Sequence, residues 1–427
     1  MDAALFYGNI VRKQLTGKHP EKAAKLIQTG LRLEQFRCRH LADKRMPKAY
    51  QYLNYEAIKV VADRLENPGK TVLTNIFAPT ELLQSFGLGG ISMECLASYL
   101  SGFRLEDYFI DAAENAGIAP TLCSYHRNFL GAVECGILGK PIMAVTTSMV
   151  CDGNVNTFRA MHDRYGIDDF VLDIPYEWSE ESENYVVAQL RQLIGILEEK
   201  TGKRYDEDAL KKIIRRENAS REEFRQAMVR RKTHAYPNTL VLVLFMLFAT
   251  HMDIGSQWVW KFFHMMNEEI ETYPEDHGKK IFWIHLSPYW QPTLQKYLNF
   301  NPDYAISCDD FNMDYMEEMD ADRPLHAIAR KALLNIYNGG FTRKTDACVR
   351  YVKEYGCDAA VEFCHWGCKQ SSGGSQLMKE AMRKAGVPML ILDGDALDRR
   401  NSHDGQIRTR FEAFLELINQ KEKEENS

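Results

Sequence analysis

The sequence predicts an α/β protein with two similar domains in series, each built on a parallel β-sheet. Short apolar runs rich in β-branched residues alternate with helical patterns of about a dozen residues, and this alternation is typical of βαβ units. The alternation occurs twice, on either side of a long stretch that contains no strand-like run. The length of 427 residues is also sufficient for two or three domains that each bury a core.

The first part of the chain is expected to be helical and the second to be an α/β unit. Residues 1–70 intersperse Lys with Glu and are broken by Pro47 and Pro68, so they are predicted to form an N-terminal helical segment. The first α/β domain is expected over residues 71–179. Its predicted strands are 71–78, 120–123, 142–147 and 169–174, and its predicted helices begin after Pro79 and cover 126–138 and 155–165.

A helical connector is expected over residues 180–236, where apolar residues recur at helical spacing between Leu190 and Leu197 amid abundant Arg and Glu. The second α/β domain is expected over residues 237–427. Its predicted strands are 280–286, 304–308, 359–363 and 388–393, with helices between them. Two of these strands follow helix stop signals, at Gly356 and at Gly386.

Composition excludes several classes of protein. The net charge is −6 and the sequence pI is about 6.1, and no long basic run is present, so nucleic acid is not an expected partner. The N-terminus lacks the order of charged, apolar and small residues that marks a secretory signal. The longest apolar run, residues 240–250, is about half the length that a membrane-spanning helix needs. We therefore expect a soluble, cytoplasmic protein that does not contact a membrane.

Ten cysteines require an explanation. Reducing compartments disfavour structural disulfides, and free cysteines are often small buried hydrophobic residues. That structural reading suits Cys38 and Cys348, in helical patterns, and Cys357, after a helix stop. Several others fall at the predicted carboxyl ends of strands: Cys123, Cys151, Cys308, Cys364 and Cys368. Ligands bind at the carboxyl ends of parallel strands, so these positions predict a thiol site.

The spacing of the thiols narrows the choice of metal. Thiolates favour iron–sulfur clusters, zinc or copper(I). Structural zinc sites take close cysteine pairs or short Cys/His mixtures, and ferredoxins place three cysteines within a few residues. Here only Cys364 and Cys368 are close together in the sequence. A site assembled from separate loops favours an iron–sulfur cluster, and a zinc-stabilised binding protein stays open as an alternative.

At these residues the sequence resembles the 2-hydroxyacyl-CoA dehydratase and benzoyl-CoA reductase family, over residues 71–418. The first similar segment is Cys-Ser-Tyr-His-Arg, which begins at Cys123, and the second is Cys-Asp, which begins at Cys151. The third is Cys-Lys at Cys368. The stretch Ile-Leu-Asp-Gly-Asp that ends at Asp395, and Thr-Arg-Phe-Glu-Ala-Phe after Ile407 and Arg408, resemble the C-terminal part of the family.

The resemblance implies two flavodoxin-like domains and an oxygen-sensitive 4Fe-4S cluster, with Cys123, Cys151 and Cys368 as its ligands. It also implies anaerobic metabolism and a separate ATP-hydrolysing iron–sulfur activator protein that delivers a low-potential electron. In the family's dehydratases, which are lyases, that electron converts the acyl-CoA thioester to a ketyl radical so that the 2-hydroxyl can leave. The chain contains no Gly-x-x-x-x-Gly-Lys-Ser/Thr motif, so no ATP site is expected in it.

Further cysteines depart from the simple pattern. Cys95, Cys135 and Cys364 accompany the three ligand positions, with Cys308 as an alternative for one of them. A chain with six candidate thiolate ligands resembles the double-cubane cluster branch of the family. In that branch a homodimer reduces small molecules. Three functions stay open: the iron–sulfur component of a dehydratase or reductase, a double-cubane reductase, and a non-catalytic electron-transfer protein. The substrate is expected to be an acyl-CoA or a small molecule, and the assembly a homodimer or a heterodimer with a related subunit.

Three polar residues beside the predicted ligands are candidates for moving protons. They are His126, Glu94 and His365. A group that titrates near neutral pH suits general acid–base chemistry. Simple hydrogen bonding to the cysteines is the alternative role for each of them.

Overall fold

The computed structural model describes residues 3–425 and the side chains of residues 3–420, and it confirms the predicted α/β class with two parallel four-stranded sheets. The strand order of the first sheet is β2-β1-β3-β4 and that of the second is β6-β5-β7-β8. The strands of the first sheet are β1 (Thr71–Thr74), β2 (Gly89–Ser92), β3 (Met143–Thr147) and β4 (Asp169–Leu172). Those of the second are β5 (Lys279–Ile284), β6 (Tyr304–Asp309), β7 (Ala359–His365) and β8 (Met389–Gly394).

Helices precede, connect and cover the two sheets. The N-terminal segment is α1 (Ala3–Thr16), α2 (Pro20–His40) and α3 (Lys48–Glu66), followed by the short η1 (Pro68–Lys70). The first sheet carries α4 (Thr80–Ser85), α5 (Met93–Gly102), α6 (Glu106–Asn115), α7 (Ser124–Glu134) and α8 (Asp152–Tyr165). The connection contains α9 (Glu180–Thr201), α10 (Glu207–Arg230), α11 (Leu240–Leu247), the π-helical η2 (Phe248–Met252) and α12 (Gln257–Ile270). The second sheet carries α13 (Pro292–Leu298), α14 (Pro324–Leu334), α15 (Phe341–Glu354), α16 (Lys369–Ser372), α17 (Ser375–Lys384), η3 (Arg399–Asn401) and α18 (Asp404–Glu425).

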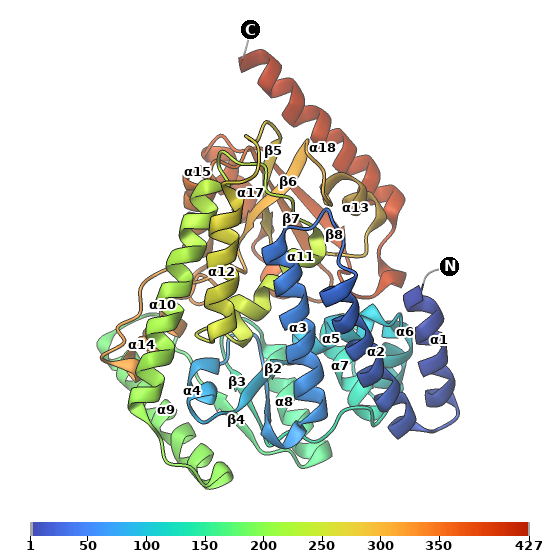
Figure 1. Cartoon of the computed structure of the whole chain (residues 1–427), viewed down its shortest axis with the longest axis vertical. Coiled ribbons are helices and arrows are strands. Elements are labelled where there is room, and N and C mark those ends of the chain that lie inside the picture. Colours follow the sequence, from blue (N-terminus) through green and yellow to red (C-terminus); the bar gives the residue numbers. More distant parts are fainter. Residues whose placement is uncertain (1–2, 426–427) are drawn as a thin grey trace.

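Figure 1 shows the two sheets one above the other, with the long helices α10 and α12 running beside them. The helices α1 and α2 lie at the side of the molecule near α5, and α18 projects from the second sheet as a rod. Among the described residues, no helix combines the length and the hydropathy needed to cross a bilayer.

Both sheets have the same topological switch point. In each, the chain order reverses between the first and third strands: β1 pairs with β3 in the first sheet and β5 with β7 in the second, all in parallel. Crevices at the carboxyl ends of such strands bind ligands, because the connecting helices leave to opposite sides there. The loops after β1, β3, β5 and β7 are therefore the places to look for a site.

The carboxyl edges of the two sheets meet through a backbone contact. Gly367, in the loop after β7, has φ +78°, a conformation that favours glycine. A Cβ atom at Gly367 would lie 2.8 Å from the Cα of Cys123, which precedes α7 of the first unit. No side chain fits between these two segments, so the loop that carries Cys368 packs directly on the start of α7.

Two local predictions are wrong and one strand was missed. Residues 120–123 form a turn instead of a strand, since Pro120 offers no N–H to a ladder and Cys123 is the N-cap of α7. Cys364 lies within β7, which continues to His365, so it does not follow the strand. The strand β2 contains Gly89 and Gly90, whose low strand propensity concealed it, but parallel pairing with β1 stabilises it.

Candidate functional site

A cavity of about 620 Å³ opens at the carboxyl edges of the two sheets. The loops after β1, β3 and β5 line it, together with the loop before α16 and parts of α1, α2, α5 and α11. Four thiols lie on its wall: Cys95, Cys123, Cys151 and Cys368. They come from both halves of the chain, so the cavity brings together residues that are far apart in the sequence.

Three of these thiols occupy the same local position. Cys123, Cys151 and Cys368 are the N-cap residues of α7, α8 and α16, respectively. Unpaired backbone N–H groups and the helix dipole make this position favourable for a thiolate. Cys95 is the third residue of α5, and its N–H group donates to the Ser92 side chain at 3.1 Å.

Each N-cap thiol lies beside a histidine. The Sγ atom of Cys123 is 3.2 Å from His365 Nε2, that of Cys151 is 3.8 Å from His126 Nε2, and that of Cys368 is 3.4 Å from His285 Nε2. All three imidazoles are at least 95% buried. Burial lowers the pKa of His126 to about 4 and also lowers the pKa values of His285 and His365, so these rings are neutral at pH 7.

The tautomer of His365 follows from its other contact. Its Nδ1 atom accepts the backbone N–H of Ala396 at 3.0 Å, so this nitrogen carries no proton. In a neutral imidazole the proton then resides on Nε2, and His365 donates an N–H···S hydrogen bond to Cys123. A second link fixes this edge, since Ser124 Oγ donates to Asp395 Oδ1 at 2.7 Å.

The thiols are close enough to influence one another. Burial raises the pKa of Cys123 well above the usual range for cysteine, and the neighbouring thiols of Cys368 and Cys151 raise it further. Burial and Cys368 raise the pKa of Cys151 to about 11. Without a cation the thiols of Cys123 and Cys151 keep their protons, and a metal would replace those protons on binding.

The three N-cap cysteines form a set of soft donors on one cavity. Within the described part of the chain, no three His, Cys, Asp or Glu side chains converge on a point in the way that ligands of one metal ion do. Cys123, Cys151 and Cys368 instead line a common cavity. Soft thiolates are the ligands of iron–sulfur clusters, and in a cluster each thiolate binds a different iron. The chemistry of these residues therefore fits such a group.

Backbone strain accompanies the site. Val150, directly before Cys151, has φ +75°, and His285, beside Cys368, has φ +71°. A β-branched residue in the left-handed region is a genuine outlier, and such strain gathers at functional sites because the surrounding structure must enforce it. Both residues line the cavity.

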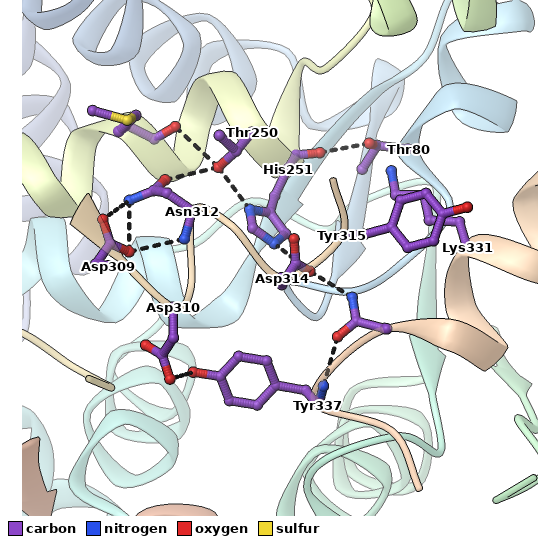
Figure 2. Close-up of polar contacts among 12 residues, drawn as sticks. Thr80, Thr250, His251, Asp309, Asp310, Asn312, Asp314, Tyr315, Lys331 and Tyr337 are labelled. Atoms are coloured by element: carbon purple, nitrogen blue, oxygen red, sulfur yellow. Dashed lines mark hydrogen bonds and ion pairs between the residues drawn. The ribbon is translucent and has the colours of Figure 1, made fainter. Parts of the chain in front are cut away.

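A buried polar network connects the two halves of the molecule close to the cavity (Figure 2). It begins at the π-helical turn η2, where His251 Nε2 lies 3.1 Å from Asp314 Oδ2 and the His251 carbonyl accepts the hydroxyl of Thr80 at 2.6 Å. Thr250 Oγ1 donates to Asn312, which in turn donates to Asp309. Short π-helical segments occur frequently at functional sites.

The same network holds His285 in its strained conformation. Asp310 accepts the backbone N–H of His285 at 2.8 Å. It also accepts the hydroxyl of Tyr337 at 2.7 Å, as Figure 2 shows. It also pairs with the ammonium of Lys344 at 2.9 Å. Phe311 packs on His285 with ring centroids 5.2 Å apart, and Phe311 stacks on Tyr337. Asp310 therefore positions the imidazole that faces Cys368.

Glu94 is a half-buried acid on the cavity wall. It lines the wall beside Cys95, and its Oε2 atom has no hydrogen-bond partner. Burial raises its pKa to about 7. The carboxyl group can therefore hold or release a proton near neutral pH, as a general acid–base residue must.

The remaining predicted cysteines lie away from the cavity wall. Cys135 is half-buried at the C-terminal end of α7. Cys364 points to the face of β7 that carries Glu362, opposite Phe363 and His365, because strand residues alternate. Cys308 is buried with its Sγ atom 3.6 Å from that of Cys357. Cys38 and Cys348 are buried in hydrophobic clusters.

Sequence reasoning missed His285 and Asp310. His285 directly follows β5, and Asp310 directly follows β6. The rule that selected the cysteines, polar residues at the carboxyl ends of parallel strands, would have found both. No local signal indicates the apolar wall that α5 and α11 contribute to the cavity.

Fold and site together define the class of the protein: two parallel α/β units that share a thiol-lined cavity at facing switch points. Residues 75–418 match the sequence profile of the family described as 2-hydroxyglutaryl-CoA dehydratase, D-component. The chain belongs to this family. At the family level it is therefore a component of a dehydratase or reductase enzyme.

Three characterised relatives are similar over most of their length. The (R)-phenyllactyl-CoA dehydratase alpha subunit of Clostridium sporogenes is 24% identical, with 80% of this chain and 87% of the relative covered. The (R)-2-hydroxyisocaproyl-CoA dehydratase alpha subunit of Clostridioides difficile is 22% identical, with 82% and 90% covered. A benzoyl-CoA reductase subunit of Thauera aromatica is 20% identical, with 72% and 79% covered.

Proposed function

We propose that the chain is the iron–sulfur component of a 2-hydroxyacyl-CoA dehydratase-type enzyme, with Cys123, Cys151 and Cys368 as ligands of one 4Fe-4S cluster. The observation that carries the proposal is the convergence of three helix N-cap thiols, each beside a buried imidazole, on one cavity. When bound there, the cluster supplies a one-electron reductant at the cavity wall. A separate ATP-hydrolysing activator delivers the electron, and a related subunit completes the enzyme.

The residues of the chain have separate tasks in this scheme. His365 donates to the thiolate of Cys123 and stabilises its charge. Phe77 and Phe311 line the cavity with apolar rings, which make the space beside the thiols unfavourable for water. Glu94 holds the proton that a leaving hydroxyl requires, because its pKa is raised to about 7 and one of its oxygens is unpartnered.

The cavity also favours a catalytic role over simple electron transfer. Its volume of about 620 Å³ lies in the range of small-molecule sites, roughly 300–1,000 Å³. An electron carrier needs no such space beside its cluster. The position of Cys135 and Cys364 away from the cavity favours one cubane, and the double-cubane reductase stays an open alternative.

Anaerobic purification followed by iron and sulfide quantitation tests the proposal. One 4Fe-4S cluster corresponds to about four iron and four sulfide ions per chain. Each of the variants Cys123→Ser, Cys151→Ser and Cys368→Ser should lose most of that iron. The control variants Cys135→Ser and Cys364→Ser should retain it. A doubled iron content that falls by half in Cys364→Ser, or bound zinc without sulfide, would contradict the proposal.

A further inference from the structure

We propose that the cavity accepts acyl groups that are apolar to their end, whether alkyl or aryl, and rejects acyl groups that end in a carboxylate. The inference rests on the proposed function, because it names the substrate class of the same site. The inference follows from the apolar character of the cavity wall away from the cysteines. The proposal that the cysteines bind a cluster does not depend on this part of the wall.

Two helix faces form a continuous part of that wall. On α5 the lining residues recur three and four positions apart: Cys95, Ser98, Tyr99 and Gly102. On α11 and the following η2 they do the same: Val241, Leu244, Phe245 and Phe248. Such spacing places each set on one side of its helix. The two faces together make an apolar chamber that starts at the thiols.

Aromatic contacts hold the two faces together. Tyr99 stacks on Phe245 with ring centroids 5.5 Å apart and an interplanar angle of 2°. It meets Phe248 edge-on, also at 5.5 Å. From Cys95 to Gly102 the face of α5 rises about 10 Å at 1.5 Å per residue. The chamber can therefore follow an acyl chain of several carbons away from the thiols.

The N-terminal helices line the far end, where several of their residues are exposed to solvent. Tyr7 of α1, with Gly30, Leu31 and Leu33 of α2, also line the cavity. A Cβ atom at Gly30 would lie 2.8 Å from the ring of Phe103, so the helix packs tightly against that side chain. This end presents carbon atoms of Tyr7 and Leu31 to a ligand, together with the exposed ion pair of Arg37 and Glu34.

The charged groups of the wall cannot receive a carboxylate. Among the described residues that line the cavity, Arg37 is the only Lys or Arg. Arg37 already donates to Glu34 at 2.7 Å, and both side chains are exposed by more than 40%. Glu94 is a half-buried residue of the wall near the thiols, and its side chain is acidic rather than basic. An unpaired carboxylate in such surroundings is strongly disfavoured.

Two thioesters of equal chain length test the inference on the full-length, anaerobically purified protein. Hexanoyl-CoA and adipyl-CoA both have six acyl carbons and differ in the terminal carboxylate, and neither carries a 2-hydroxyl that could be eliminated. Isothermal titration calorimetry, with free CoA as the reference, should give a Kd for hexanoyl-CoA at least tenfold below that for adipyl-CoA. Equal or tighter binding of adipyl-CoA would overturn the inference and leave the proposed function standing. If neither thioester binds more tightly than CoA, the proposed function fails together with the inference.

A charge introduced into the chamber should reverse the preference. Leu244 is half-buried on the lining face of α11, and Leu244→Lys places an ammonium there. Binding of adipyl-CoA should tighten at least tenfold and binding of hexanoyl-CoA should weaken. Leu377 is exposed on α17, outside the cavity, so Leu377→Lys is the matched control and should change neither. Unchanged affinities in a folded Leu244→Lys protein would contradict the inference. If the variant does not fold, the comparison of the two thioesters on the unsubstituted protein still tests the inference.

Discussion

The contacts of His365 define which of its ring nitrogens carries the proton, and therefore which atom donates in its hydrogen bond with Cys123. The N–H group of Ala396 occupies its Nδ1 atom, and the Nε2 proton therefore faces Cys123 Sγ at 3.2 Å. If Cys123 is a cluster ligand as proposed, a hydrogen bond to its sulfur withdraws electron density from it and raises the reduction potential of the bound cluster. A buried, neutral imidazole provides this donor over the whole physiological pH range, because its pKa is lowered.

Replacing this donor should lower the reduction potential of the proposed cluster. One hydrogen bond is worth about 1 kcal/mol, which corresponds to roughly 40 mV for a one-electron couple. His365→Phe should shift the midpoint by that amount in an EPR-monitored redox titration. His365→Gln keeps an N–H donor and should recover part of the shift. The exposed His403 is the control, and a potential that stays constant in iron-replete His365→Phe would refute the role.

At the scale of the element, β7 separates two kinds of environment. Its alternating residues direct Phe363 and His365 to one face and Glu362 and Cys364 to the other. Glu362 is fully buried, and neither of its carboxyl oxygens has a hydrogen-bond partner. Burial, opposed by Lys344 and reinforced by Asp310, raises the pKa of Glu362 to about 8.

This carboxyl group should make the stability of the protein depend on pH. In the unfolded chain the pKa of Glu362 returns to 4.5, so between about pH 4.5 and pH 8 the folded state binds more protons than the unfolded state. The free energy of unfolding should therefore fall as pH rises through this window, by up to about 1.4 kcal/mol per pH unit from this group. Denaturant titrations at pH 6 and pH 8 measure the effect.

The variant Glu362→Gln tests whether Glu362 causes this pH dependence of the unfolding free energy. It cannot ionise, so its unfolding free energy should fall less between pH 6 and pH 8 than that of the unsubstituted protein. The exposed Glu416 is a suitable comparison, and Glu416→Gln should leave the pH dependence unchanged. An identical pH profile for Glu362→Gln would show that the group is ionised in the folded protein.

At the scale of the whole molecule, a buried ion network joins the two α/β units and the connector. The ammonium of Lys331 on α14 contacts Glu81 of α4 at 2.5 Å and Glu217 of α10 at 2.9 Å. Arg221 contacts Glu217 at 2.6 Å. The two cations hold the pKa of Glu217 down to about 2 despite its complete burial. These three helices belong to parts of the chain that are far apart in the sequence.

Removal of Lys331 should therefore destabilise the molecule as a unit. Lys331→Met leaves Glu81 and Glu217 with one cation between them, and uncompensated buried charges of this kind cost about 3–5 kcal/mol. Chemical denaturation should show a loss of that size. The exposed pair of Arg383 and Glu380 provides the control, since Arg383→Met should cost less than about 0.5 kcal/mol. A loss in Lys331→Met no larger than the control would contradict the role of the network.

Much of the fold and part of the site follow from local sequence patterns. Seven of the eight strands lie where apolar runs predict them, and only β2 was missed. The short segments around Cys123, Cys151 and Cys368 indicated the family, and the match of residues 75–418 to the family profile confirms it. These patterns are local, because strand periodicity, helix caps and turn residues depend on neighbours in the chain.

The content of the cavity was decided by tertiary structure alone. Whether Cys95 or Cys364 faces the cavity depends on helix phase and strand alternation, and a shift of one residue would exchange the faces. The approach of His285 to Cys368 and of Gly367 to Cys123 depends on how two sheets pack across a long connection. Sequence by itself therefore determined the two parallel sheets and singled out the thiols, although it placed Cys123 at the end of a strand instead of at the start of α7. Packing between distant segments determined which side chains share the cavity, because that packing is set by contacts that no local pattern encodes.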